Sequence, residues 1–275
     1  MVSQEQRRRQ LAREKFLRQQ QRRTQARRKA RTRNSVIASV LGVIVIGSVA
    51  LYTTGVMKGD DKKDTAAGVT PSATPTSKAP DPCAKPAAGS AKKLSWKKEP
   101  AMTIDTSANY SMKLATTCGD IDIALKTAAA PHTVNSFDFL AGQGYFDHTK
   151  CHRLTTDGIF VLQCGDPQGT GMGGPGYTLP DENLKDNSLK GNKYPAGTVA
   201  MANTGQKHTG GSQFFLVYKD SPLPPSYTPF GTVSDAGMKV LQKIAAAGAQ
   251  AADPTSGNTA PNATVVINKA TVSKS

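Results

Sequence analysis

The hydrophobic pattern of the chain begins with a long uncharged run. Residues 35–57, "SVIASVLGVIVIGSVALYTTGVM", contain no Asp, Glu, Lys or Arg. A helix of this length, rising about 1.5 Å per residue, can cross roughly 30 Å of hydrocarbon, so the run predicts a transmembrane helix. A cleaved signal peptide is the alternative, but its apolar core would span about 7 to 15 residues and an A-x-A-like site would follow. Neither feature is present, and the pattern favours an anchor.

From residue 110 onward, apolar residues recur with a period of two. The stretch "YSMKLATTCGDIDIALK" alternates apolar and polar positions on both sides of residues 117–120, which predicts a β-hairpin with its turn there. Further short strands are predicted around residues 151–155, 160–164, 197–202, 213–218 and 263–272.

Two segments show a helical period instead. In "APHTVNSFDFLAGQG", Pro131 suits a first turn and Gly142 a stop; in "DAGMKVLQKIAAAG", Asp235 suits a cap and Gly248 an end. The apolar stripes are Val134, Phe137, Leu140 and Ala141 in the first, and Met238, Leu241 and Ile244 or Ala245 in the second. Many short strands with two helices favour a mainly β barrel closed by helices over a βαβ layer.

The charge distribution predicts how the chain is oriented across a membrane. Residues 1–34 form a basic head that contributes +11 of the formal net charge of +15. The lysines that follow the apolar run, Lys58, Lys62 and Lys63, are offset by Asp60, Asp61 and Asp64. The positive-inside bias therefore places the amino terminus in the cytoplasm and the rest of the chain outside. The head can also lie along anionic lipid, with nucleic-acid binding as the weaker alternative.

Composition divides the outer part in two. Residues 58–107 are rich in Pro, Ala, Ser, Thr and Lys and poor in large apolar side chains, which predicts a flexible linker; residues 108–273 have the mixed composition of one globular domain. All four cysteines lie in the outer part, as expected in an oxidising compartment. We expect Cys83 to pin the linker to the domain. Neither the cysteines nor the four histidines have zinc-ligand spacing, so no metal site is expected.

Four cysteines allow three pairings. We favour Cys151 with Cys164, because the strands flanking the turn at 155–159 should be neighbours, and this leaves Cys83 with Cys118. The period of two argues against it, because Cys151 shares the face of Arg153 whereas Cys164 is one residue off the face of Gln163. Gly165 would have to break the alternation.

The candidate chemistry lies in "CHRLTTDGIFVLQCGD", residues 151–166, where Arg153 and Gln163 stand among apolar side chains. Arg cannot act as a base and Gln cannot ionise, so such a site would orient and polarise a substrate. "GTGMGGPG" lacks the Lys-Ser/Thr of a phosphate loop, and "GGSQFF" is not a nucleophile elbow, which argues against a triad of His152, Asp166 and Ser212. We expect His152 to be buried and hydrogen-bonded.

Several blocks resemble one family in order and approximate spacing. "HRLTTDGIFVLQCGDPQGTGMGGPGY", "DEN", "GTVAMANTG", "GGSQFFLVY" and "FGTV" are similar to cyclophilin-type peptidyl-prolyl cis-trans isomerases, here in a membrane-anchored bacterial form. The resemblance covers about residues 108–273. It implies a closed eight-stranded antiparallel β-barrel capped by two α-helices, with a substrate groove on the outer surface and no cofactor.

The resemblance also implies roles for individual residues. The catalytic arginine falls on Arg153, and the pocket for the proline ring falls on Phe160, Val161, Phe215 and Leu223. Gln163 and Gln213 fall on polar groove positions, Ala202, Asn203 and Thr204 on the segment that pairs with the substrate backbone, and Tyr227 where a histidine often closes the pocket. Val161 stands where many members have Met, and Pro222 where some have Trp. We therefore expect cyclosporin to bind weakly. The loop "LTTDGI" is longer by two residues and "GQKHTGGS" by one.

The sequence thus predicts an enzyme that isomerises X-Pro bonds in secreted or cell-envelope proteins. Its partners would be proline-containing polypeptides and the membrane, with no nucleic acid. The alternative is a non-catalytic chaperone or scaffold that holds proline-containing segments in the same groove.

Overall fold

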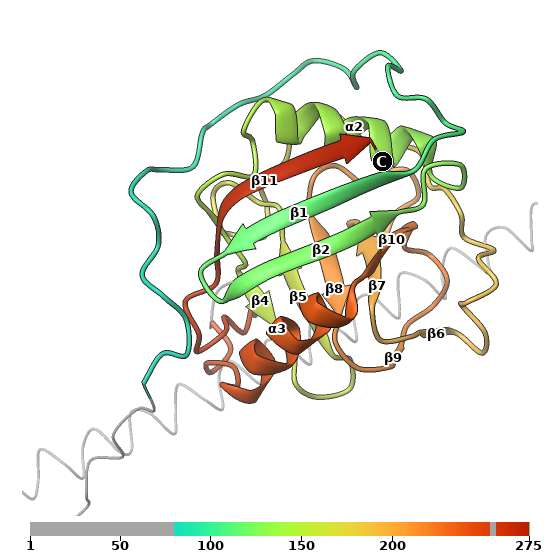
Figure 1. Ribbon diagram of the computed structural model, residues 1–275. Coiled ribbons are helices and arrows are strands. Elements are labelled where there is room, and N and C mark those ends of the chain that lie inside the picture. The colour runs from blue at the N-terminus through green and yellow to red at the C-terminus, as the bar shows by residue number, and fades with distance from the viewer. Residues whose placement is uncertain (1–79, 254–256, 275) are drawn as a thin grey trace, which may run out of the picture. The chain divides into compact units, whose positions relative to one another are not determined.

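The computed structural model describes residues 80–253 and 257–274 (Figure 1). The predicted basic head, the predicted transmembrane helix and the predicted linker as far as residue 79 lie outside the described residues. Within the described ranges, no helix is both long and apolar enough to span a membrane.

The predicted hairpin is confirmed. Strands β1 (Tyr110–Thr116) and β2 (Gly119–Leu125) pair antiparallel, with Tyr110 opposite Leu125 and Thr116 opposite Gly119. Alternate residues on both strands, such as Leu114 and Ile121, are buried. This one-sided burial is the reason why apolar and polar residues alternate in the sequence. The turn is shorter than predicted, since only residues 117–118 separate the strands.

One antiparallel sheet of nine strands contains this hairpin. Its order is β3 (Thr149–Lys150), β11 (Val266–Lys274), β1, β2, β10 (Pro229–Val233), β7 (Thr198–Met201), β8 (Phe214–Val217), β5 (Val161–Cys164) and β4 (Arg153–Leu154). A second sheet pairs β6 (Lys193–Tyr194) with β9 (Ser221–Pro222). Strands β3 and β4 stand at opposite ends of the large sheet, yet only residues 151–152 separate them in the chain. The sheet must therefore curl to bring its ends together.

This topology contradicts the predicted closed eight-stranded barrel. The fold is mainly β, as predicted, but among the described strands no ladder joins β3 to β4, so the sheet is a curled half-barrel. Backbone groups at the seam bond to another segment instead. Cys151 N–H donates to Val265 O at 3.0 Å and Leu154 N–H to Thr259 O at 2.7 Å. The chain leading into β11 thus occupies the gap.

Both predicted helices are present, α2 (Pro131–Gly142) packing on β11 and α3 (Asp235–Ala246) on β2 (Figure 1). Their ends differ from the prediction. Ser234, not Asp235, caps α3, because its hydroxyl accepts from Gly237 N–H at 3.1 Å. Gly142 is the last helical residue of α2, and the chain turns at Gly144, which has a φ of +66°.

The start of α2 depends on a distant residue. Ala130 at its N-cap supplies no side-chain hydrogen bond. The Glu182 carboxylate accepts from the backbone N–H groups of His132 and Thr133 at 3.0 and 2.9 Å. A carboxylate at this position also interacts favourably with the helix dipole.

Residues 80–107, which the sequence assigns to the flexible linker, contain no helix or strand; we call them the strap. Figure 1 shows the strap following the outside of the domain from the first described residues toward β1. It is fastened by the Cys83–Cys118 disulfide, by Ala84 N–H to Thr117 O at 2.8 Å, and further along by Trp96. The second disulfide joins Cys151 to Cys164, so the structure contains both favoured pairs.

Candidate active site

Four residues from four neighbouring strands form one row on the outer face of the sheet. Arg153 on β4 lies opposite Gln163 on β5, Gln163 lies opposite Phe215 on β8, and Phe215 lies opposite Ala200 on β7. We call these residues the outward row. Their chain neighbours, such as Leu154, Leu162 and Phe214, point the other way into the main core. Because alternate side chains of a strand lie on the same face, the four residues share the outer face of the sheet.

A cavity of about 150 Å³ lies on this row, and we call it the apolar cavity after the side chains of Val161, Phe215 and Leu223 in its lining. It is lined by Arg153, Ile159, Val161, Gln163, Ala202, Asn203, Phe215, Leu223 and Tyr227. Phe215 is only 5% exposed, and Tyr227 meets its ring edge-on with 5.4 Å between centroids. Buried Tyr194 fixes Tyr227 in turn, since its hydroxyl donates to Tyr227 O at 2.7 Å. Three rings thus hold one another rigidly.

The polar edge of the cavity is a chain of hydrogen bonds. Arg153 Nη1 donates to Gln163 Oε1 at 3.1 Å, Gln163 Nε2 to Gln213 Oε1 at 2.8 Å, and Gln213 Nε2 to Gly173 O at 2.9 Å. This chain fixes the direction of both amide groups. The described residues give the half-buried Arg153 guanidinium no further hydrogen bond, so its other N–H groups are available to a ligand in the cavity.

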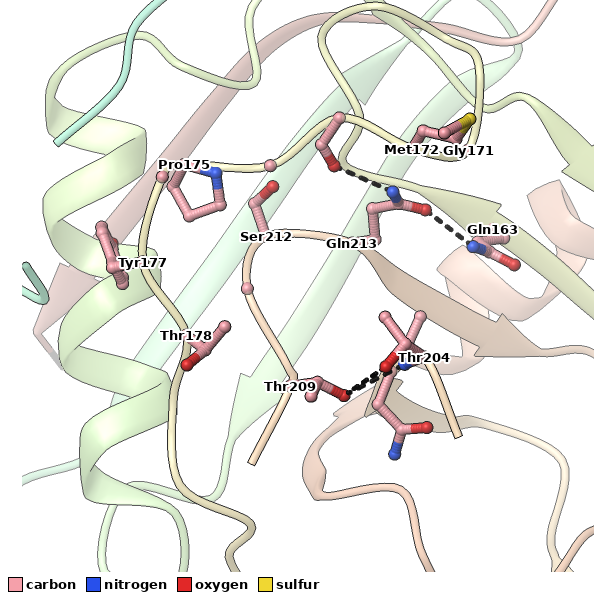
Figure 2. A pocket seen from close by; sticks show the side chains of 16 residues that line it. Gln163, Gly171, Met172, Pro175, Tyr177, Thr178, Thr204, Thr209, Ser212 and Gln213 are labelled. Carbon is pink, nitrogen blue, oxygen red and sulfur yellow. Dashed lines mark hydrogen bonds between the residues drawn. The ribbon is translucent and has the colours of Figure 1, made fainter. Parts of the chain in front are cut away.

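A second cavity of about 620 Å³ adjoins the first. Figure 2 shows part of its lining, with Pro175, Tyr177 and Thr178 on one segment and Ser212 and Gln213 on the segment that runs beside it. Gln163, Ala202 and Asn203 line both cavities. The two hollows are therefore parts of one groove, with a narrower end beside Arg153 and a wider end beside the glycine-rich loop.

Comparison with known proteins agrees with this geometry. A family model described as cyclophilin type peptidyl-prolyl cis-trans isomerase/CLD matches residues 111–272. The chain belongs to this cyclophilin family.

The cyclophilin domain has close relatives among curated proteins. The probable peptidyl-prolyl cis-trans isomerase B of Mycobacterium leprae is 52% identical over 149 residues, which make up 51% of this chain and 50% of the relative. The protein of the same description from Mycobacterium tuberculosis is 51% identical over 149 residues, covering 51% and 48%. The chain thus spans about half the length of these relatives. A crystal structure of a Cryptosporidium parvum cyclophilin type isomerase matches with a TM-score of 0.49 and 27% identity, over 61% of this chain and 99% of that one.

Within the cyclophilin groove, the glycine-rich loop is organised by Asp166. This fully buried carboxylate accepts backbone N–H groups from Gln168, Thr170, Gly171 and Gly173 at 2.7 to 3.1 Å. Burial raises the pKa of Asp166, but the hydrogen bonds outweigh this effect and hold the pKa below its ordinary value. Asp166 is therefore a structural anion that shapes one wall of the second cavity.

His152 behaves differently from the prediction. It is 7% exposed, as expected for a buried side chain, but neither ring nitrogen has a hydrogen-bond partner. Burial is the main cause that lowers the pKa of His152; Asp166 opposes the shift and Arg153 adds to it. Among the described residues no acceptor stands within reach of its N–H, and burial therefore favours the neutral imidazole.

The structure brings most of the predicted residues of the cyclophilin site together. Arg153, Val161, Gln163, Ala202, Asn203, Phe215, Leu223 and Tyr227 line the apolar cavity, and Gln213 and Thr204 line the second one. Phe160 lines neither: its ring meets Tyr218 at 6.0 Å, with Lys219 Nζ 4.5 Å from its centroid. Ile159 lines the apolar cavity instead. Period two from Val161 was the available signal, because it places Ile159 on the cavity face.

Proposed function

We propose that this cyclophilin domain catalyses cis-trans isomerisation of X-Pro peptide bonds. The outward row carries the proposal, because it places a guanidinium and a fixed amide directly beside an apolar cavity. A hollow lined by Phe215, Val161 and Leu223 suits a pyrrolidine ring, which is apolar and lacks a donor.

The chemistry needs no nucleophile. The barrier of about 18–20 kcal/mol arises from delocalisation of the amide nitrogen lone pair into the carbonyl. When the bond twists, the prolyl nitrogen becomes pyramidal and a stronger acceptor. A hydrogen bond from Arg153 to that nitrogen is therefore stronger in the twisted state than in the planar one, which is the condition for catalysis. Lowering the barrier by about 7 kcal/mol would accelerate isomerisation roughly 10⁵-fold.

Preorganisation supports the same reading. Gln163 orients Arg153, and Gln213 orients Gln163, so the guanidinium does not have to be ordered during the reaction. Asn203 is fixed from the other side, where its Nδ2 donates to Ser226 O at 2.8 Å. The apolar cavity would hold the ring while the preceding carbonyl rotates past Gln163 and Asn203. Residues flanking the X-Pro pair would extend into the second cavity.

For substrates and location, we propose X-Pro bonds of secreted or cell-envelope proteins and a membrane-anchored domain outside the cytoplasm. The support comes from the sequence of residues 1–57, in which a basic head precedes an uncharged run. Two disulfides in the described domain suit an oxidising compartment.

Exchange spectroscopy on a short X-Pro peptide tests the function. A substoichiometric amount of the protein should produce exchange between the cis and trans resonances, which the free peptide shows only over tens to hundreds of seconds. Peptide binding without accelerated exchange would contradict the enzyme and favour the non-catalytic chaperone or scaffold.

A further inference from the structure

The strap enters the domain's apolar interior at Trp96. Its indole meets the ring of Phe139 on α2 edge-on, with 5.1 Å between centroids, and lies 6.0 Å from the ring of Tyr145. Tyr145 is fully buried. Ile104 of the strap belongs to the main core, and Leu94 and Trp96 are partly buried strap side chains that pack against it. Trp96 therefore anchors the strap independently of the disulfide at Cys83.

One wall of the second cavity rests on this anchor. Trp96 N–H donates to Pro175 O at 2.8 Å. Gly176, whose φ is +90°, approaches so closely that a Cβ there would lie 2.6 Å from Trp96 O and would overlap Ser95 Oγ. Pro175 and Gly176 both line the second cavity. The strap thus supports this wall from outside.

The adjoining part of the lining, at Ser212, is linked to Trp96 through Tyr145. Ser212, which is 1% exposed and lines the cavity (Figure 2), donates its hydroxyl proton to Gly165 O at 2.8 Å. The hydrogen bond of 3.0 Å between Tyr145 Oη and Ser212 Oγ must then be donated by Tyr145. Burial raises the pKa of Tyr145 to about 12, so the tyrosine keeps this proton at neutral pH.

We propose that Trp96 is a positioning residue that holds these two adjoining parts of the cavity lining in place and so selects the side chains flanking the X-Pro pair. The inference rests on the proposed isomerase function. The supported wall contains Gly173, Gly174 and Gly176, and glycine-rich backbone has little side-chain packing to hold it in place. Asp166 and Gln213 hold this wall at Gly173, and the strap holds it at Pro175 and Gly176.

The test compares wild type with Trp96→Ala on three substrates. One is a blocked X-Pro dipeptide that reaches only the apolar cavity; the other two are tetrapeptides carrying Ala or Phe next to the X-Pro pair. The ratio of kcat/KM for the Phe and Ala tetrapeptides should change by about 5-fold or more in the variant. Activity on the dipeptide should stay within about 2-fold, because Arg153 and the apolar cavity are untouched. The change should lie in KM, since the contact is with the substrate's flanking side chain.

Glu99→Gln is the matched control. It changes the strap's hydrogen bond with His132, in which Glu99 Oε1 lies 2.7 Å from His132 Nδ1, and neither residue lines the cavity. The Phe to Ala ratio should stay at the wild-type value. Trp96→Phe serves if Trp96→Ala does not fold, because Phe keeps a ring against Phe139. Both variants keep the backbone bond to Pro175. Trp96→Phe should shift the ratio in the same direction by a smaller factor.

Two outcomes would overturn the inference. The first is an unchanged ratio in a folded Trp96 variant, and the second is an equal loss on all three peptides, which would mean general destabilisation. If the wild type isomerises no peptide, the proposed function fails instead. The ratio is then taken from the Kd values of the two tetrapeptides, measured by titration calorimetry because Trp96 is the single Trp of the chain, and the same two outcomes still apply.

Discussion

Arg153 and Gln163 face each other as cross-strand partners of β4 and β5, and Arg153 Nη1 donates to Gln163 Oε1 at 3.1 Å. The backbone register of two short strands therefore fixes the distance between the cation and the amide that orients it. Strand β4 contains only Arg153 and Leu154, so its position depends on β5 on one side and on Thr259 on the other.

Replacing Arg153 tests the mechanism. Arg153→Ala should reduce kcat/KM on a short X-Pro peptide by about 10² or more, equivalent to roughly 2.7 kcal/mol of transition-state stabilisation. Arg153→Lys should recover little, because Lys keeps the charge but lacks the planar fork. Both variants should fold and bind proline peptides, since the outward side chain adds little to the core. A folded Arg153→Ala protein with near wild-type turnover would remove Arg153 from catalysis.

Gln163→Leu separates orientation from charge. The substitution keeps a side chain of similar size but removes the acceptor for Arg153 and the donor to Gln213. Loss of one orienting hydrogen bond, about 1 to 1.5 kcal/mol, should lower kcat/KM roughly 5- to 10-fold, less than the loss of Arg153 itself. A melting curve checks that the fold is retained. A decrease as large as that of Arg153→Ala would mean that Gln163 acts directly on the substrate.

Cyclosporin affinity tests the departure at Pro222. This exposed residue of β9 has no side-chain N–H to donate, so the wild type should bind cyclosporin weakly. Pro222→Trp should tighten binding by about 10-fold, the value of one added hydrogen bond. Titration calorimetry measures both proteins, with isomerase activity as the control for folding. Tight binding by the wild type would show that another part of the groove replaces the missing donor.

The buried His152 predicts a loss of stability in mild acid. Its pKa in the folded protein is lowered below the ordinary 6.5, mainly by burial, so the folded state favours the neutral ring. The stabilisation is complete above about pH 6.5 and is lost as pH falls from there toward the folded pKa, by at most about 1.4 kcal/mol per pH unit. In denaturant titrations between pH 7 and pH 5, His152→Gln should lose less stability than the wild type. Equal pH slopes would contradict a buried neutral His152.

The orientation of the chain predicts a protease pattern. Protease added outside intact cells should remove the region from about Lys58 onward and spare the basic head, because the charge bias places the amino terminus inside. Antibodies to residues 1–34 and to the cyclophilin domain would follow the two parts. Protection of the domain in intact cells would contradict this topology.

Local sequence signals were sufficient where one face of an element is buried. The alternation in β1 and β2 and the stripe on α2 follow from period, whereas the family resemblance supplied Arg153, Gln163 and Phe215 of the outward row. Strand β10 was missed because "PFGTV" contains Pro and Gly, which argue against a strand. In the structure Gly231 is required there, since a Cβ would lie 2.7 Å from Ile123 Cγ2.

Other features depend on partners that are distant in sequence. No pattern near α2 indicates that Glu182, about 50 residues later, accepts from its first N–H groups. The strap has the composition of a linker, and its attachments include one disulfide and Trp96, whose aromatic neighbours lie more than 40 residues away. The sequence also could not predict that the ring nitrogens of His152 lack a hydrogen-bond partner among the described residues, because this depends on how the interior packs.

The disulfide between Cys83 and Cys118 also determines where mechanical force enters the domain. Cys118 lies in the turn between β1 and β2, two strands near the middle of the sheet order. A pull on the chain from the amino-terminal side of Cys83 passes through the covalent bond into this turn. The strap from residue 84 onward lies outside that load path, so tension on the chain leaves Trp96 and the walls of the second cavity unstretched. Reduction of this one bond would reroute the load through Trp96 and make the groove sensitive to tension.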